Sequence, residues 1–353
     1  MEELPAIGKI SPAIFRELIF PRLGAKDQSI LVGPQHGTDV GIIEIAGQAV
    51  SLTTDPVFIV PEYGWEQAAW FAIHILASDS VTCGLPPKYL SIDLNLPMEI
   101  TEEQLAVMWE TMHRECEKMG IAVITGHTGR YENCHYPMVG GATLVGVGDI
   151  DSYVSPKFIK PGDKIIITKG PAIEATGILG ATFPVHIEQS LGKDTARKAR
   201  DIFYKMSVVT EAIAAISAGV RDDGVSAMHD ATECGIWGGL YELAEAAGVG
   251  VIVDQDKIVM EPGVAEVCCF YGLDPYISIS EGTLIIACRP HKADEVVHLI
   301  HKQGVKASVA GQFTDKDQGM VLMKRGNRRP LVHPIVDPFW DAFYKALEHR
   351  GNQ

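Results

Sequence analysis

Residues 89–130, YLSIDLNLPMEITEEQLAVMWETMHRECEKMGIAVITGHTGR, decide the fold class because two periodicities follow one another in them. Residues 89–96 alternate between apolar and polar, which predicts a strand with one buried face. Thr101 and Gln104 have the spacing of a capping box, and apolar residues then recur at helical spacing up to Gly120. Residues 121–125 predict a second strand. A strand, a helix and a strand in succession indicate a layered α/β or α+β fold.

The same alternation extends over the rest of the chain. Strands are expected at residues 48–55 and 138–148, with a helix at 64–78. A stretch rich in Pro and Gly, residues 152–162, then precedes the strand KIIIT at 164–168. We therefore expect two domains, residues 1–155 and 156–333, and a tail, residues 334–353, that docks as a helix. Further expected strands are 226–229, 283–288 and 307–312, and further expected helices are 208–218, 238–247 and 291–303.

Composition and charge narrow the class of protein. The 353 residues are 46% hydrophobic and carry a formal net charge of −15, which weighs against a nucleic-acid-binding surface. The longest uncharged run, residues 133–148, is shorter than the roughly 20 residues of a membrane span. Glu2 and Glu3 do not fit a signal peptide. The seven cysteines include no C-x-x-C pair, so we expect them to be reduced thiols and the protein to be cytoplasmic. They are Cys83, Cys116, Cys134, Cys234, Cys268, Cys269 and Cys288.

Four aspartates stand where predicted strands or helices end, namely Asp39, Asp55, Asp79 and Asp230. Ligand-binding crevices tend to lie at the carboxyl ends of strands, and carboxylate oxygens suit Mg²⁺ that bridges nucleotide phosphates. For any one of these residues taken alone, the simpler reading is a cap of a turn or helix. The recurrence beside small residues favours a shared site, although spacing alone leaves both readings open.

A glycine-containing stretch, GHTGR at residues 126–130, follows a predicted strand and is a candidate phosphate-binding loop. Thr128 and Arg130 could donate hydrogen bonds to an anion, and His127 could be a base or a ligand. An ordinary turn is at least as consistent with the pattern. Lys169 ends the strand KIIIT and could hold a phosphate or simply be solvated. The chain has no P-loop, dinucleotide-binding fingerprint, nucleophile elbow or protein-kinase signature, so ATP would be bound by another fold.

Together these motifs resemble the aminoimidazole ribonucleotide synthetase-like (PurM-like) ATP-binding superfamily, and most closely its HypE-like branch of hydrogenase maturation factors. The resemblance extends over most of the chain. It rests on TTDPVFIV (53–60), AIHILASDSVTCGLPPKYL (72–90), ITGHTGR (124–130), KPGDKIIITKG (160–170), MHDATECGIWGGLYELAEAAGVGV (228–251) and YGLDPYISISEGTLIIA (271–287).

The resemblance implies a two-domain fold, N-terminal domains that pair in a homodimer, and a cleft for ATP and Mg²⁺. It also implies a role for each matching residue. Those expected to bind the metal are Asp39, Asp55 and Asp79. Those expected to bind the nucleotide are Asp39, Thr54, Asp55, Asp79, Gly126, His127, Thr128 and Asp230. Those expected to act in catalysis are Asp79, Arg130 and Lys169.

The chain departs from the family pattern at two places. His127 stands where several members have an acidic residue or Asn. The HypE branch ends in a cysteine that is carbamoylated, whereas the last cysteine here is Cys288 and the chain ends HRGNQ. We therefore expect a HypE-related enzyme that uses ATP and Mg²⁺ to activate an unidentified acceptor by phosphoryl transfer. The alternatives are a nucleotide-binding accessory that acts through a maturation-factor protein, and a small-molecule kinase similar to thiamine monophosphate kinase.

Overall fold

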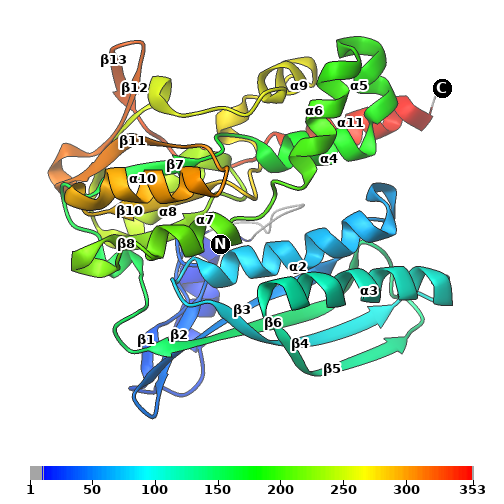
Figure 1. Cartoon of the computed structure of the whole chain (residues 1–353), viewed down its shortest axis with the longest axis horizontal. Helices are drawn as coiled ribbons and strands as arrows, with labels where there is room; N and C mark the ends of the chain where they lie inside the picture. Colours follow the sequence, from blue (N-terminus) through cyan, green and yellow to red (C-terminus); the bar gives the residue numbers. More distant parts are fainter. Residues whose placement is uncertain (1–9, 11, 352–353) are drawn as a thin grey trace.

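The first half of the chain forms a six-stranded sheet in the order β1-β2-β3-β6-β4-β5 (Figure 1). The computed structural model describes residue 10 and residues 12–351. Within this sheet β4 and β5 run parallel, and the other neighbouring strands are antiparallel. The strands are β1 (Ile30–Val32), β2 (Gly41–Ile45), β3 (Gln48–Phe58), β4 (Pro87–Leu96), β5 (Ala122–Arg130) and β6 (Met138–Asp149).

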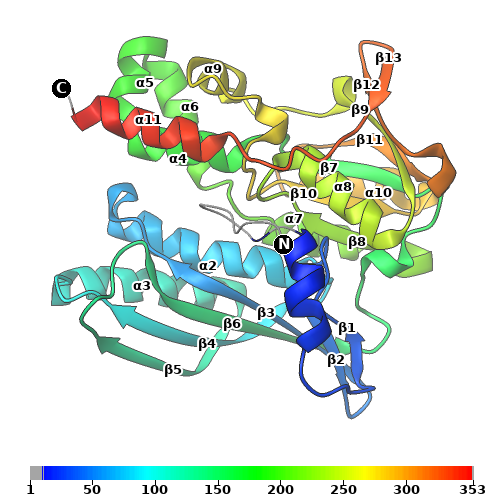
Figure 2. The ribbon, with the colours of Figure 1, turned by 180° about the vertical axis from the view of Figure 1, so that it is seen from behind.

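Two helices, α2 (Trp65–Val81) and α3 (Glu102–Met119), cover one face of this sheet (Figure 1). The capping box expected at the start of α3 is present, since Thr101 Oγ1 accepts from Gln104 N and Gln104 Oε1 accepts from Thr101 N. The alternating apolar residues of β4 are buried against the helices, as their period-2 pattern predicts. Over β4, β5 and β6 no described helix covers the opposite face (Figure 2).

The second half forms a seven-stranded sheet in the order β13-β12-β9-β11-β7-β10-β8. Both of its faces are covered: Ile165 and Ile167 of β7 share a core with α8 (Gly235–Ala247), whereas Ile166 faces α7 (Val209–Ile216) and α10 (Ala293–Lys302). This explains why β7 is apolar without alternation. The strands are β7 (Lys164–Thr168), β8 (Val225–Asp230), β9 (Gly250–Asp254), β10 (Leu284–Cys288), β11 (Ala307–Thr314), β12 (Met320–Lys324) and β13 (Asn327–Pro330).

A group of helices stands beside the second sheet (Figure 2). The tail contributes a helix to this group, and Phe339 and Phe343 of that helix are buried against Phe183. Among the described residues, no helix combines the length and the apolar composition that crossing a bilayer requires. The remaining α-helices are α1 (Pro12–Ile14), α4 (Ile173–Thr182), α5 (Pro184–Leu191), α6 (Lys193–Phe203), α9 (Val264–Phe270) and α11 (Phe339–Gly351).

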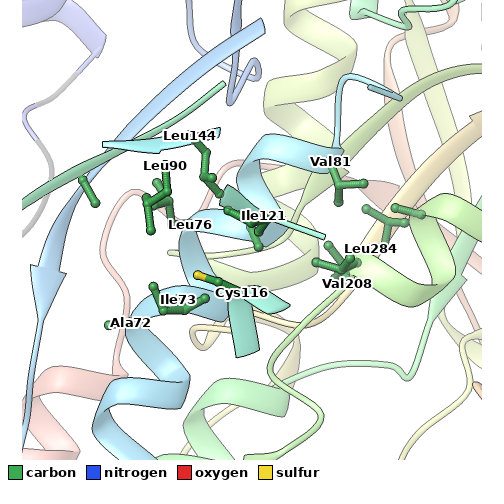
Figure 3. Close-up of a cluster of buried hydrophobic side chains, with 14 of the residues drawn as sticks. Ala72, Ile73, Leu76, Val81, Leu90, Cys116, Ile121, Leu144, Val208 and Leu284 are labelled. Atoms are coloured by element: carbon green, nitrogen blue, oxygen red, sulfur yellow. The ribbon is translucent and has the colours of Figure 1, made fainter. Parts of the chain in front are cut away.

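Helix α2 joins the two halves, because its apolar side chains pack on both. Figure 3 shows Leu76 near Leu90 and Leu144 of the first sheet, and Val81 near Val208 and Leu284 of the second half. The end of α2 therefore lies between the two sheets. The mixed α/β fold expected from the sequence is confirmed, with helices on two sheets.

Candidate functional site

The structure gathers the four aspartates that the sequence predicts to form a site. Asp39 lies between β1 and β2, Asp55 in β3, Asp79 in the last turn of α2, and Asp230 at the end of β8. Burial raises the pKa of Asp79 well above its usual value, and the nearby charges of Asp55, Asp39 and Asp230 raise it further. Carboxylates from both halves of the chain therefore share one electrostatic environment.

Strand parity in β3 decides which of its side chains reach this cluster. Thr53 and Asp55 lie on the covered face, and Thr53 Oγ1 donates to the main-chain oxygen of Asp39 at 3.0 Å. Thr54 has the opposite parity and is exposed, with its hydroxyl 2.9 Å from that of Thr143. Thr54, which was expected to bind the nucleotide, therefore does not lie with the carboxylates.

Glu281 joins the cluster, although it is not among the site residues predicted from the sequence. Asp230 and Glu281 are each 1% exposed, and no donor among the described residues reaches Asp230 Oδ1, Asp230 Oδ2 or Glu281 Oε1. Burial raises the pKa of Asp230 to about 6, with a further contribution from Asp39. Burial and the charge of Asp230 raise the pKa of Glu281 well above its usual value. The two carboxyls are in contact: a hydrogen bond from protonated Glu281 lowers the pKa of Asp230, and the same contact raises that of Glu281.

The acidic region continues from Glu281 to Glu174 in α4. Glu174 Oε2 accepts a hydrogen bond from Glu281 N at 3.0 Å. Burial raises the pKa of Glu174 to about 8, and the charges of Asp337, Asp230 and Glu233 add to this shift. Isolated buried carboxylates are costly because they lose hydration. Bound protons or a bound cation would therefore stabilise the cluster.

Lys169 does not supply a free positive charge to this cluster. It is buried, and its Nζ lies 2.5 Å from Glu211 Oε1 and donates to Ser207 O at 2.6 Å. Its charge lowers the pKa of Asp230, so it is within electrostatic reach of the site. The ammonium is nevertheless already paired, and a catalytic role for Lys169 stays a prediction.

The stretch at residues 126–130 is part of strand β5 and does not form the expected loop. Parallel pairing with β4 continues to its end, where Leu96 lies opposite Arg130. The pairing matches Asp55 with Ala142, Ala142 with Ile92 and Ile92 with Gly126. Gly126 is therefore three strand spacings, or about 14 Å, from Asp55 along the sheet. β5 continues to Arg130 because β4 pairs with it over its whole length.

The polar side chains of this part of β5 make local contacts at the exposed edge. His127 Nε2 lies 2.5 Å from Tyr131 Oη, and Arg130 Nη2 donates to the main-chain oxygen of Met98. Gly126, His127 and Thr128 are exposed. Within one chain, these residues and Arg130 are not brought to the carboxylates, so their expected roles in binding and catalysis stay predictions.

The donor chemistry of the cluster fits a hard divalent cation. Asp55 Oδ2 and both carboxylate oxygens of Asp230 are buried and accept no hydrogen bond from the described residues. Oxygen ligands of this kind suit Mg²⁺, which binds through one or two carboxylates together with phosphate oxygens and water. No three His, Cys, Asp or Glu side chains among the described residues are arranged as a ready-made metal site.

Two curated relatives match nearly the whole chain. A putative hydrogenase expression/formation protein of Methanocaldococcus jannaschii is 22% identical over 94% of this chain and 96% of its own length. Carbamoyl dehydratase HypE of Escherichia coli strain K12 is 26% identical over 86% of this chain and 88% of its own length.

Known structures share the fold. HypE in a HypE–HypF complex matches 84% of this chain and 93% of its own, with a TM-score of 0.68 and 20% identity. HypE in complex with ATP matches 94% of this chain and 97% of its own, with a TM-score of 0.60 and 18% identity. A ThiL protein complexed with AMPPCP and TMP matches 82% of this chain and 88% of its own, with a TM-score of 0.66 and 18% identity.

Two family models cover most of the chain and divide it between them. The N-terminal domain of AIR synthase related protein matches residues 37–147, which include the first sheet from Asp39 to β6. The C-terminal domain of AIR synthase related protein matches residues 160–324, which include most of the second sheet. The chain belongs to the AIR synthase related protein family, which has the PurM-like fold, and its curated relatives include HypE proteins of hydrogenase maturation.

Proposed function

We propose that this protein is a HypE-like enzyme that uses ATP and Mg²⁺ to activate an acceptor by phosphoryl transfer, in the maturation of a hydrogenase or another metallocentre. The observation that carries the proposal is the meeting of Asp39, Asp55 and Asp79 with Asp230, whose buried oxygens lack donors. Similarity to HypE proteins, one of them in complex with ATP, supports the same activity. A cytoplasmic location is part of the proposal.

In this proposal the carboxylates of Asp39, Asp55 and Asp79 hold the metal. Bound Mg²⁺ would offset negative charge on the transferring phosphoryl group. Asp230, at the end of β8, would face the first domain and help to bind the nucleotide. Glu281, whose pKa is raised well above its usual value, would lose its proton when the cation binds and would then accept the proton that the acceptor group releases. Catalysis then depends mainly on positioning and on charge neutralisation.

We also propose that the protein acts as a homodimer that pairs through its first sheet. β5 is an edge strand with exposed apolar side chains, since Val123 is 44% and Ile124 60% exposed. A second copy on this edge would cover them and remove an edge prone to unwanted pairing. Pairing would also place a second set of Gly126, His127 and Thr128 near the assembly's interface, where a nucleotide role for them could be tested.

Two alternatives follow from particular similarities. The likeness to HypE in a complex with HypF favours an accessory that binds nucleotide and acts through a maturation-factor protein. The likeness to ThiL with AMPPCP and TMP favours a kinase of a small phosphorylated molecule. An autonomous kinase would form ADP with thiamine monophosphate and no protein partner, whereas an accessory would form ADP only when the partner is present.

The test is calorimetric titration with Mg²⁺ and AMPPCP, accompanied by an assay of ADP formation from ATP. We expect Asp55→Asn and Asp79→Asn to weaken binding of the metal–nucleotide complex by at least about 10-fold, the loss that removing a supporting residue of a metal site commonly causes. Glu188→Gln, which changes an exposed carboxylate of α5, serves as the matched control. Equal binding by wild type and both Asn variants would refute the proposed site.

A further inference from the structure

Four side chains lie end to end, from Asp39 to His333 in the segment that follows β13. Asp39 Oδ2 is 2.9 Å from His229 Nδ1, and His229 Nε2 is 3.4 Å from Glu242 Oε2. Glu242 Oε1 is in turn 3.1 Å from His333 Nε2. The chain of contacts thus starts in the first domain, crosses β8 and α8, and ends in residues 331–338, which connect β13 to α11. We name these residues the connecting segment.

The positions of the ring hydrogens show which side chain donates at each of these contacts. Ile335 N donates to His333 Nδ1 at 3.0 Å, so the ring hydrogen of His333 is on Nε2 and points to Glu242. His229 has a carboxylate oxygen beside each ring nitrogen and donates to both. Asp39 Oδ2 is therefore engaged by His229, and Asp230 N also points to it at 3.5 Å. Among the residues that the structure describes, no donor reaches Asp39 Oδ1, so this oxygen is the one open to a ligand.

In a second, independent contact, the loop that carries Asp39 packs closely against α8. Gly37 has a positive φ of +73°, and a Cβ there would lie 2.5 Å from the main-chain oxygen of Glu242. Only glycine allows this approach. Glu242 thus contacts the loop of Asp39 directly through its backbone, and its side chain reaches Asp39 only through His229.

We propose that Glu242 and His333 are positioning residues that fix the orientation of Asp39 through His229, so that the connecting segment controls how the first carboxylate of the site binds its cation. The inference rests on the proposed Mg²⁺–nucleotide site. Partners that hold a metal ligand commonly contribute 10–100-fold to metal affinity. The connecting segment is held at both ends, because Leu331 N donates to Met320 O at 2.9 Å and Asp337 Oδ2 accepts from Cys234 N at 2.7 Å.

The experiment measures binding of Mn²⁺, as a paramagnetic substitute for Mg²⁺, by electron paramagnetic resonance in the presence of AMPPCP. We expect His333→Ala and Glu242→Ala to weaken Mn²⁺ binding about 10-fold. His333→Gln, whose side-chain amide can still donate to Glu242, should recover most of the affinity. The matched controls are Glu245→Gln, on the exposed side of α8, and His298→Gln, on the exposed side of α10, and both should bind as wild type does.

A spectroscopic readout separates positioning from loss of fold. In protein labelled with ¹⁵N-histidine, His333→Ala should shift the ring resonances of His229, although Glu242 lies between the two side chains. Glu242→Gln, which keeps the size of the side chain, repeats the binding measurement if Glu242→Ala unfolds. Wild-type affinity and unchanged His229 resonances in the variants would overturn the inference while leaving the proposed function intact. A wild-type protein that binds neither Mn²⁺ nor AMPPCP would overturn both.

Discussion

Glu174→Gln should stabilise the ligand-free protein, and the gain should grow with pH. The pKa of Glu174 is raised from 4.5 to about 8, mainly by burial and then by Asp337, Asp230 and Glu233. The folded state therefore keeps a proton that the unfolded state releases above pH 4.5. The contribution of this group to stability is fully present below pH 4.5 and is lost as the pH rises towards 8.

The size of the effect follows from the shift. At pH 7, about 2.5 units above the pKa in the unfolded state, the raised pKa of Glu174 lowers the free energy of unfolding by about 3 kcal/mol. At pH 6 it lowers the free energy of unfolding by about 2 kcal/mol. Glutamine carries no charge at either pH and can still accept the hydrogen bond from Glu281 N. The free energy of unfolding of Glu174→Gln should thus exceed that of wild type by about 1 kcal/mol more at pH 7 than at pH 6.

Urea unfolding at pH 6 and pH 7, in EDTA and without nucleotide, measures this difference. The urea dependence of the free energy should be the same for both proteins, so that a change in midpoint reports stability. Glu188→Gln, at an exposed position of α5, is the control and should follow wild type at both pH values. A Glu174→Gln variant that is no more stable than wild type, or equally stabilised at both pH values, would show that Glu174 is not a buried, protonated acid.

Two further predictions concern buried pairs outside the cluster. Lys169→Met should destabilise the protein by about 3–5 kcal/mol because it leaves Glu211 buried without its partner, and the double variant with Glu211→Leu should recover much of this loss in urea unfolding. Burial lowers the pKa of His74 from 6.5 to about 4 despite the opposing effect of Glu115, so the folded state excludes a proton that the unfolded state binds below pH 6.5. Wild type should therefore lose about 2 kcal/mol of stability relative to His74→Gln between pH 7 and pH 5, measured in the same way.

Elements whose partners lie close in sequence could be predicted from the sequence alone. The alternation in β4 and the capping box of α3 are local patterns, and each reflects one buried face. The apolar run of β7 was also recognisable, because a strand covered on both faces needs no polar side. The selection of Asp39, Asp55, Asp79 and Asp230 depended on their places at element ends and on the family resemblance.

Features that depend on pairing between distant strands could not be predicted in this way. The glycines of residues 126–130 suggested a loop, yet β5 continues because residues 92–96 of β4 lie beside it. The family resemblance implies a nucleotide role for both Thr54 and Asp55, but consecutive strand residues face opposite sides. Sequence proximity is thus a poor guide to which side chains of a strand share a site.

Glu281 was missed for a related reason. It precedes β10, and β10 pairs with β8 so that Leu284 lies opposite Asp230. Antiparallel pairing therefore brings Glu281 to Asp230 from about 50 residues away. The available signal was an acidic residue among small ones, ISISEGT, directly before an apolar run, in a stretch that also carries the family resemblance. Without the strand pairing, nothing in that stretch identifies its partner.

The acidic cluster also links stability to cation binding. The basic groups nearest to it are already paired, Lys169 with Glu211 and His229 with Asp39. Only protons or a bound cation can then relieve the repulsion between the remaining carboxyls, and protons become scarce as the pH rises past the raised pKa values of Asp230 and Glu174. We therefore expect 10 mM Mg²⁺, a concentration chosen as roughly saturating for a weak carboxylate site, to raise the melting temperature more at pH 8 than at pH 6. A larger rise at pH 6 would mean that the cation binds elsewhere, because protons and Mg²⁺ compete for the same oxygens.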